Sequence, residues 1–78
     1  SGGELLEDIK PGDRLYIEDR GYTVTAVGEK ANDNIRLMGH VCLKFDEKPT
    51  SEMPGDIHLK GTEPLTVELG EKITIESA

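Results

Sequence analysis

Short runs of alternating apolar residues, separated by turn signals, constrain the fold of this chain most. Leu15-Tyr16-Ile17 follows Pro11-Gly12-Asp13, and Tyr22 to Val27 follows Asp19-Arg20-Gly21. Proline fixes its own φ and glycine permits unusual backbone angles, so both clusters predict turns. The β-branched and aromatic residues that come after them favour strands. The two runs together predict a β-hairpin.

Three further segments also alternate between apolar and polar residues: His40 to Phe45, Asp56 to Lys60 and Lys72 to Glu76. Strands this short and this frequent leave little room for the crossover helices of a parallel sheet. We therefore expect an all-β domain, a mainly antiparallel small barrel or half-barrel, with one short helix near residues 29–38. The polar stretch from Asp46 to Pro54 is too irregular for an element and is expected to be a mobile loop.

The helix is predicted from a change of period. Ala31, Ile35 and Met38 are spaced i, i+4 and i+7, which places them on one helical face. Gly39 follows directly and favours a helix end. Glu29 is expected at the start, where the helix dipole favours an anion.

Composition limits the class of protein. Seventy-eight residues predict a single domain over residues 1–78, and a formal charge of −7 disfavours nucleic acid and anionic membrane surfaces as partners. The lone Cys42 cannot form an internal disulfide, which is typical of a reducing compartment. No apolar run approaches the roughly 20 residues of a membrane-spanning helix, and the start of the chain lacks the pattern of a signal peptide. We therefore expect a cytoplasmic protein.

Two histidines, His40 and His58, are the candidates for chemistry, because a neutral imidazole is a nucleophile near pH 7. His40 directly follows a helix-ending glycine, a place where imidazole often has a structural role. If their strands are neighbours, the two histidines and Cys42 could share a face and bind a metal. Their spacing lacks the close pairs of zinc sites, so no metal and no other cofactor is expected. Asp46 and Asp56 flank the polar stretch and are interpreted as solvated turn residues.

Four segments in a fixed order resemble the glucitol/sorbitol-specific IIA component of the bacterial phosphotransferase system. They are Tyr22 to Gly28, Met38-Gly39-His40-Val41, Leu43-Lys44-Phe45-Asp46 and Pro54-Gly55-Asp56-Ile57-His58. The resemblance extends over most of the chain. It is therefore the main indication of function.

The resemblance implies a phosphocarrier for sugar uptake, whose histidine accepts a phosphoryl group and passes it on. It implies that the partners are a phosphocarrier protein and the IIB and IIC components of the sugar transporter. The protein would reach the membrane only through that transporter. In the family the acceptor precedes a Gly-Glu-Leu step, here Gly3-Glu4-Leu5. The acceptor would then lie upstream of this chain, which would be the C-terminal part. His40 and His58 would flank the site, and whether the chain itself is an enzyme stays open.

Two further expectations follow. Strands absent from the N-terminal side would leave unpaired sheet edges, which predicts a homodimer formed by strand pairing. The alternative function is a non-catalytic small-barrel module for binding or scaffolding. In that case the stretch from Asp46 to Pro54 would contact a protein or a small ligand.

Overall fold

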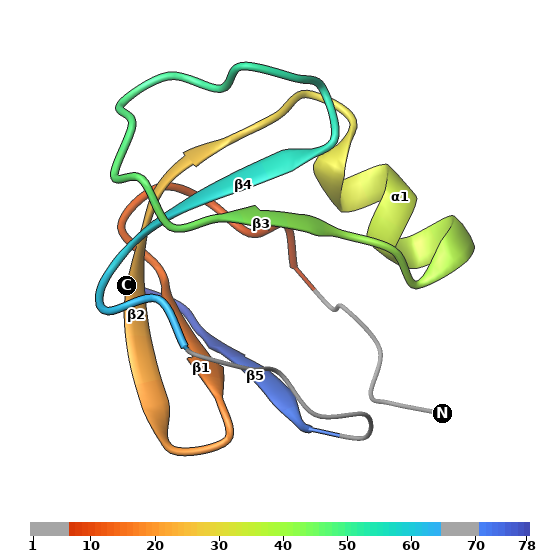
Figure 1. Cartoon of the computed structure of the whole chain (residues 1–78). Coiled ribbons are helices and arrows are strands. Elements are labelled where there is room, and N and C mark those ends of the chain that lie inside the picture. The colour runs from red at the N-terminus through yellow and green to blue at the C-terminus, as the bar shows by residue number, and fades with distance from the viewer. Residues whose placement is uncertain (1–6, 65–70) are drawn as a thin grey trace.

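The computed structural model describes residues 7–64 and 71–78, which form one five-stranded sheet with a single helix beside it (Figure 1). In chain order the elements are β1 (Arg14–Ile17), β2 (Arg20–Val27), α1 (Ala31–Met38), β3 (Cys42–Lys44), β4 (Asp56–Lys60) and β5 (Ile73–Glu76). The predicted all-β class with one short helix is confirmed. The Gly3-Glu4-Leu5 step lies outside the described residues. No helix in the described ranges is long and apolar enough to cross a membrane.

The strands lie in the order β3-β4-β2-β1-β5, so β3 and β5 are the edges of an open sheet. The strands of the described residues form an open mixed sheet and do not close into a barrel. Three of the pairings are antiparallel, as predicted, whereas β3 runs parallel to β4. The segment 45–55 that joins these two strands has close to the dozen residues that a parallel return needs, and it makes this return without a helix.

The cap of α1 explains why two predicted boundaries differ from the observed ones. The helix begins at Ala31, after Lys30, and so Glu29 precedes it. At the other end Gly39 adopts a left-handed conformation with φ 63°, and the backbone N–H of His40 donates to Asn34 O at 3.4 Å. The left-handed residue turns the backbone away from the helix axis, and the bond from His40 satisfies a carbonyl of the last helical turn. His40 therefore belongs to the cap, and β3 begins only at Cys42.

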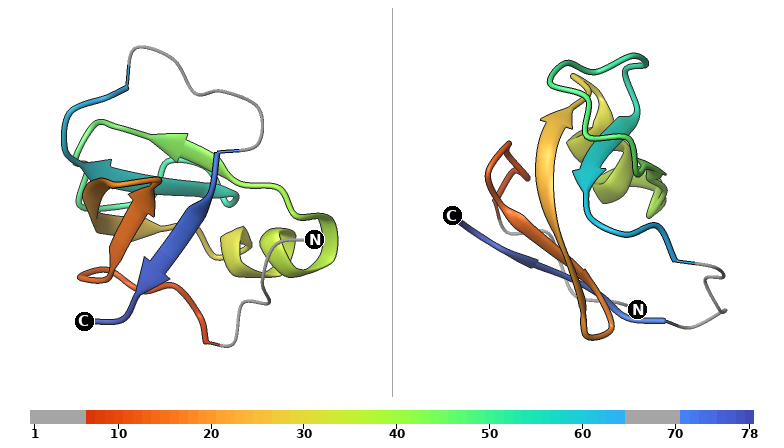
Figure 2. Two further views of the ribbon diagram at one scale, coloured as in Figure 1. Left: turned by 90° about the horizontal axis from the view of Figure 1, so that it is seen from below. Right: turned by 60° about the vertical axis from the view of Figure 1, so that its left-hand side comes forward.

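The main core lies on one face of the sheet, which curls around it with β3 and β5 at opposite edges (Figure 2). Its buried members come from the strands, from the helix start and from the N-terminal segment: Ile9, Leu15, Ile17, Tyr22, Val24, Ala31, Ile57 and Leu59. Phe45 covers this cluster edge-on to Tyr22, with ring centroids 5.2 Å apart. The period of two in the sequence thus identifies the core residues of β1 and β4 correctly.

Asn32 connects the N-terminal segment to the helix. Its side-chain oxygen accepts from the backbone N–H of Ile9 at 2.8 Å, and its side-chain nitrogen donates to Ile9 O at 3.1 Å. Asparagine is a poor helix former in isolation. Its place in α1 is explained by these two bonds, which hold the buried Ile9 against the core.

Asp13 is a buried carboxylate that joins two distant parts of the chain. Only 1% of this residue is exposed. Its carboxylate accepts from the backbone N–H of Lys10 at 2.9 Å and of Ala78 at 3.0 Å. The bond from Lys10, followed by that from Ala78, holds the pKa of Asp13 below its ordinary value. The ionised carboxylate therefore fixes the turn before β1 to the segment after β5.

Replacing Asp13 by asparagine should destabilise the fold, because the amide nitrogen would face a backbone N–H donor. We expect the free energy of unfolding at pH 7 to fall by about 1 to 3 kcal/mol. A carboxylate with a lowered pKa stabilises the fold above its unfolded-state pKa, and this stabilisation is lost as the pH falls through the folded-state pKa. The difference between the wild type and D13N should therefore shrink below about pH 3.9.

Urea denaturation at pH 7 and at pH 3 measures this difference. D19N, at an exposed aspartate in the hairpin turn, is the matched control and should leave the stability unchanged at pH 7. An equal gap between the wild type and D13N at both pH values would contradict the assignment.

Candidate functional site

A β-bulge gives β2 two buried faces. Val24 pairs with Leu59 and Ala26 pairs with His58, so the register shifts by one residue between them. Val24 and Val27 consequently both face the main core, whereas Ala26 faces the other side of the sheet with His58. Ala26 is only 4% exposed although it lies outside the main core cluster. The opposite face of the sheet is therefore covered as well.

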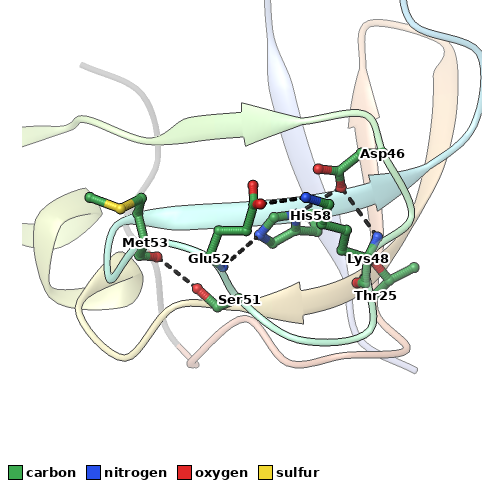
Figure 3. Close-up of polar contacts among 7 residues, drawn as sticks. All are labelled: Thr25, Asp46, Lys48, Ser51, Glu52, Met53 and His58. Carbon is green, nitrogen blue, oxygen red and sulfur yellow. Dashed lines mark hydrogen bonds and ion pairs between the residues drawn. The ribbon is translucent and has the colours of Figure 1, made fainter.

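The cover is the segment from Asp46 to Pro54, which we call the 46–54 loop (Figure 3). The first four residues of β4, from Asp56 to Leu59, are all buried. Ile57 and Leu59 enter the main core, while His58 has no exposed surface beneath the loop. His58 does lie on the face opposite Ile57 and Leu59, as the period predicts, but this face is interior.

Both ring nitrogens of His58 are bonded to the 46–54 loop. Nδ1 lies 2.8 Å from Asp46 Oδ1, and the backbone N–H of Glu52 points at Nε2 with a separation of 3.3 Å (Figure 3). Because a backbone N–H can only donate, Nε2 is the acceptor and carries no proton. Nδ1 then carries the ring proton and donates it to Asp46. The geometry therefore assigns His58 as the neutral Nδ1–H tautomer.

The charges of the loop support this arrangement. The hydrogen bond from His58 is the largest effect that holds the pKa of Asp46 below its ordinary value, and the backbone N–H of Lys48 adds to it at 3.2 Å from the same oxygen. The Lys48 ammonium pairs with the Glu52 carboxylate, which raises the pKa of Lys48. The pair between Lys48 and Glu52 thus connects the two halves of the loop.

Backbone contacts fix the path of the loop over the sheet. Four hydrogen bonds attach it at both ends and in the middle: Glu47 N to Leu59 O, Thr25 Oγ1 to Lys48 O, Asp56 N to Met53 O and Lys30 N to Pro54 O. Gly28 lies under the far end, where a Cβ would be 2.1 Å from the Pro54 carbonyl oxygen. Only glycine permits this approach. A stretch that the sequence predicts to be mobile thus has an ordered, hydrogen-bonded path.

The structure does not bring the predicted site residues together. His40 is exposed in the helix cap, ahead of β3. In the parallel ladder Lys44 is the register partner of His58, and Cys42 is the partner of Asp56. Within residues 7–64 and 71–78 no group of three or more histidine, cysteine or acidic side chains has the geometry to hold a metal ion.

The interpretation as a solvated turn residue is wrong for Asp56, which begins β4, whereas Asp46 is exposed at a bend as expected. Asp46 bonds the buried imidazole, and Asp56 is only 3% exposed. Asp56 Oδ2 is buried and, among the described residues, has no hydrogen-bond partner. The one sequence signal for this site is a histidine inside the apolar β4 segment, since a buried imidazole requires polar partners nearby.

The arrangement limits the chemistry of each histidine. His58 has both ring nitrogens bonded and no exposed surface, so its imidazole is not available to an incoming phosphoryl group while the loop is in place. His40 is exposed and accessible. In this conformation His58 therefore stabilises the 46–54 loop, and its reactivity depends on that loop.

Comparison with known proteins gives a consistent family. A family model described as the PTS system glucitol/sorbitol-specific IIA component matches residues 1–74. The PTS system glucitol/sorbitol-specific EIIA component of Escherichia coli is 40% identical over 75 residues, which cover 96% of this chain and 61% of that protein. The protein of the same name from Shigella flexneri is equally similar. The chain thus spans about three-fifths of these relatives, and no solved structure matches it significantly.

Two substitutions at Asp46 test the bond to His58. D46L leaves the buried Nδ1–H without an acceptor and should lower the midpoint of urea denaturation more than D46N, whose amide oxygen still accepts. The pKa of Asp46 is lowered in the fold, so its ionised form stabilises the fold at neutral pH. The gap between the wild type and D46N should therefore narrow as the pH falls below about 3.9.

The control is E47Q in the same loop, which should behave as the wild type. Equal midpoints for the wild type and D46L at pH 7 would show that the bond does not stabilise the fold.

Proposed function

Because the chain belongs to the glucitol/sorbitol-specific IIA component family of the phosphotransferase system, we propose that it is part of a phosphocarrier for sugar uptake. The observation that carries the proposal is the 40% identity across 96% of the chain. The four segments of the initial resemblance all lie inside this match. A glucitol or sorbitol pathway is proposed because the matched relatives carry these names.

We propose that the acceptor imidazole of the whole phosphocarrier lies outside these 78 residues. The curated relatives extend well beyond the matched region, which is 61% of their length. Within the described residues, His58 is enclosed and both of its nitrogens are bonded. A phosphoryl acceptor needs one ring nitrogen free to attack. We therefore propose that His58 has a structural role beside the acceptor's site. The exposed His40 is proposed as a second residue near that site.

The partners follow from the proposed reaction. A phosphocarrier protein donates the phosphoryl group, and the IIB and IIC components of a sugar transporter receive it. Such a protein would act in the cytoplasm and reach the membrane only through the transporter. The charge of −7 is compatible with this role, because an acidic domain favours basic protein surfaces over nucleic acid and anionic lipid.

We also propose that two copies associate by strand pairing at β5. This strand is an edge of the described sheet, and its Ile73 is 47% exposed. An exposed apolar side chain on an unpaired edge favours pairing with another chain. The symmetrical form of this contact is an isologous dimer, in which both copies use the same strand.

Phosphorylation in vitro tests the proposed function. The 78-residue chain and a version extended at its N-terminus are incubated with phosphoenolpyruvate and the general phosphotransferase proteins. We expect acid-labile phosphate only on the extended protein, because the acceptor lies in the extension. H40Q in the extended protein should retain labelling but slow it by about 100-fold, the lower end of what a positioned acid or base contributes.

Labelling of the 78-residue chain that disappears in H40Q or H58Q would place the acceptor within it and contradict the proposed location. Failure of both proteins to accept phosphate would reject the phosphocarrier and favour the non-catalytic binding or scaffolding module.

Sedimentation equilibrium at micromolar concentration tests the dimer. I73K adds a charge to the β5 edge and should convert the dimer to a monomer, because like charges would face each other across a symmetrical contact. L37K alters an equally apolar residue on α1 that is 82% exposed, and this control should remain dimeric. A wild-type chain that is monomeric at these concentrations would reject the proposed contact.

A further inference from the structure

The geometry points to His58 as a proton-operated latch: a second proton on its ring releases Ser51 and Glu52 of the 46–54 loop and opens the covered face of β4 at His58. This device is independent of the proposed phosphocarrier function. It rests on the burial of His58, on its two hydrogen bonds and on the position of the loop above it (Figure 3).

The two bonds of His58 respond oppositely to protonation. The bond from Glu52 N–H needs an unprotonated Nε2, whereas the bond to Asp46 needs a protonated Nδ1. A second proton would place an N–H group against the N–H of Glu52. No water can separate them, because His58 has no exposed surface. The same proton strengthens the bond to Asp46, since a charged donor then faces a carboxylate.

The loop is therefore expected to open only around Ser51 and Glu52. Met53 and Pro54 stay attached through the bonds from Asp56 N to Met53 O at 3.1 Å and from Lys30 N to Pro54 O at 2.9 Å. Its first part stays attached through Asp46 and through the bond from Glu47 N to Leu59 O at 3.1 Å. The part around Glu52 depends on the Nε2 bond and on the ion pair with Lys48, whose two side chains are about half exposed. Exposed ion pairs contribute little to stability. The Nε2 bond is consequently the interaction that decides whether Ser51 and Glu52 stay closed.

The titratable groups that face His58 come from the loop and from β3. Asp46, Lys48 and Glu52 come from the loop, and Lys44 is the register partner on β3. The partner on β2 is Ala26, which does not titrate.

Asp56 precedes His58 by two residues and shares its face of β4. Its Oδ2 atom is buried and, in the described part of the chain, has no hydrogen-bond partner. Opening at Ser51 and Glu52 would expose a cationic imidazole on the face that Asp56 shares. The latch thus controls the accessibility of the His58 imidazole on this face.

Amide hydrogen exchange of the ¹⁵N-labelled chain tests the latch between about pH 5 and 8, the range in which histidine ordinarily changes charge. Rates are expressed as protection factors, which remove the intrinsic pH dependence of exchange. Protection of the Glu52 amide should fall about tenfold as His58 gains its second proton, the change that corresponds to loss of about one hydrogen bond. Protection of the Val24 amide, which donates to Asp13 O at 2.8 Å in the main sheet, should stay constant.

Two non-titrating variants separate the two bonds. H58Q places a neutral amide near the position of Nε2, so Glu52 should stay protected at every pH. H58N places its amide near Nδ1 and leaves Glu52 without an acceptor, so Glu52 should be poorly protected throughout. H40Q removes the exposed histidine and should retain the wild-type pH dependence.

Three results would overturn the latch. The first is a ¹⁵N spectrum that shows the proton of neutral His58 on Nε2. The second is constant Glu52 protection in the wild type while His58 titrates. The third is a parallel loss of protection at Val24, which would mean that the whole domain unfolds and that no local opening occurs. The first two measurements use the wild type alone, so they decide the matter even if a variant fails to fold.

Discussion

The position of a single bulge in β2 determines how this small domain uses its sheet. Between Val24 and Ala26 the strand gains one residue, so its side chains change faces relative to β4. Before the bulge β2 supplies Val24 to the main core, and after it Ala26 joins His58 on the opposite face. A chain of 78 residues buries a limited share of its surface. Using both faces of the same two strands increases that share, and it requires a cover over the second face.

The covered face is held by polar groups. Burying an imidazole is costly unless its nitrogens are bonded, and the 46–54 loop supplies the Asp46 carboxylate and the Glu52 N–H. Asp13 is also a buried polar group, and its carboxylate accepts two backbone N–H bonds, from Lys10 and from Ala78. In both places a buried polar side chain bonds segments that are distant in sequence or irregular in structure. These residues specify which segments meet, a task that apolar contacts perform with less directional precision.

The sequence predicts the local elements well because each depends on neighbours within a few residues. Turn residues and a period of two identify the hairpin of β1 and β2, and a period near 3.6 with Gly39 identifies α1. The bulge is not predictable in this way, since Tyr22 to Val27 is one uninterrupted run of strand-forming residues. The parallel pairing of β3 with β4 and the contact between Asp46 and His58 depend on where the 46–54 loop crosses the sheet. That path is a tertiary property.

Family resemblance and geometry answer different questions about His58. The resemblance includes it in the segment Pro54-Gly55-Asp56-Ile57-His58, and a histidine in a phosphorelay family invites a chemical role. The geometry gives it a sufficient structural role, because one ring nitrogen donates to Asp46 and the other accepts from Glu52. Nucleophilic attack needs a free lone pair and access to the donor, and the closed loop denies both. Any chemistry at this imidazole therefore requires the 46–54 loop to open first. The stability of the closed loop, rather than the identity of the histidine, then governs the reactivity of His58.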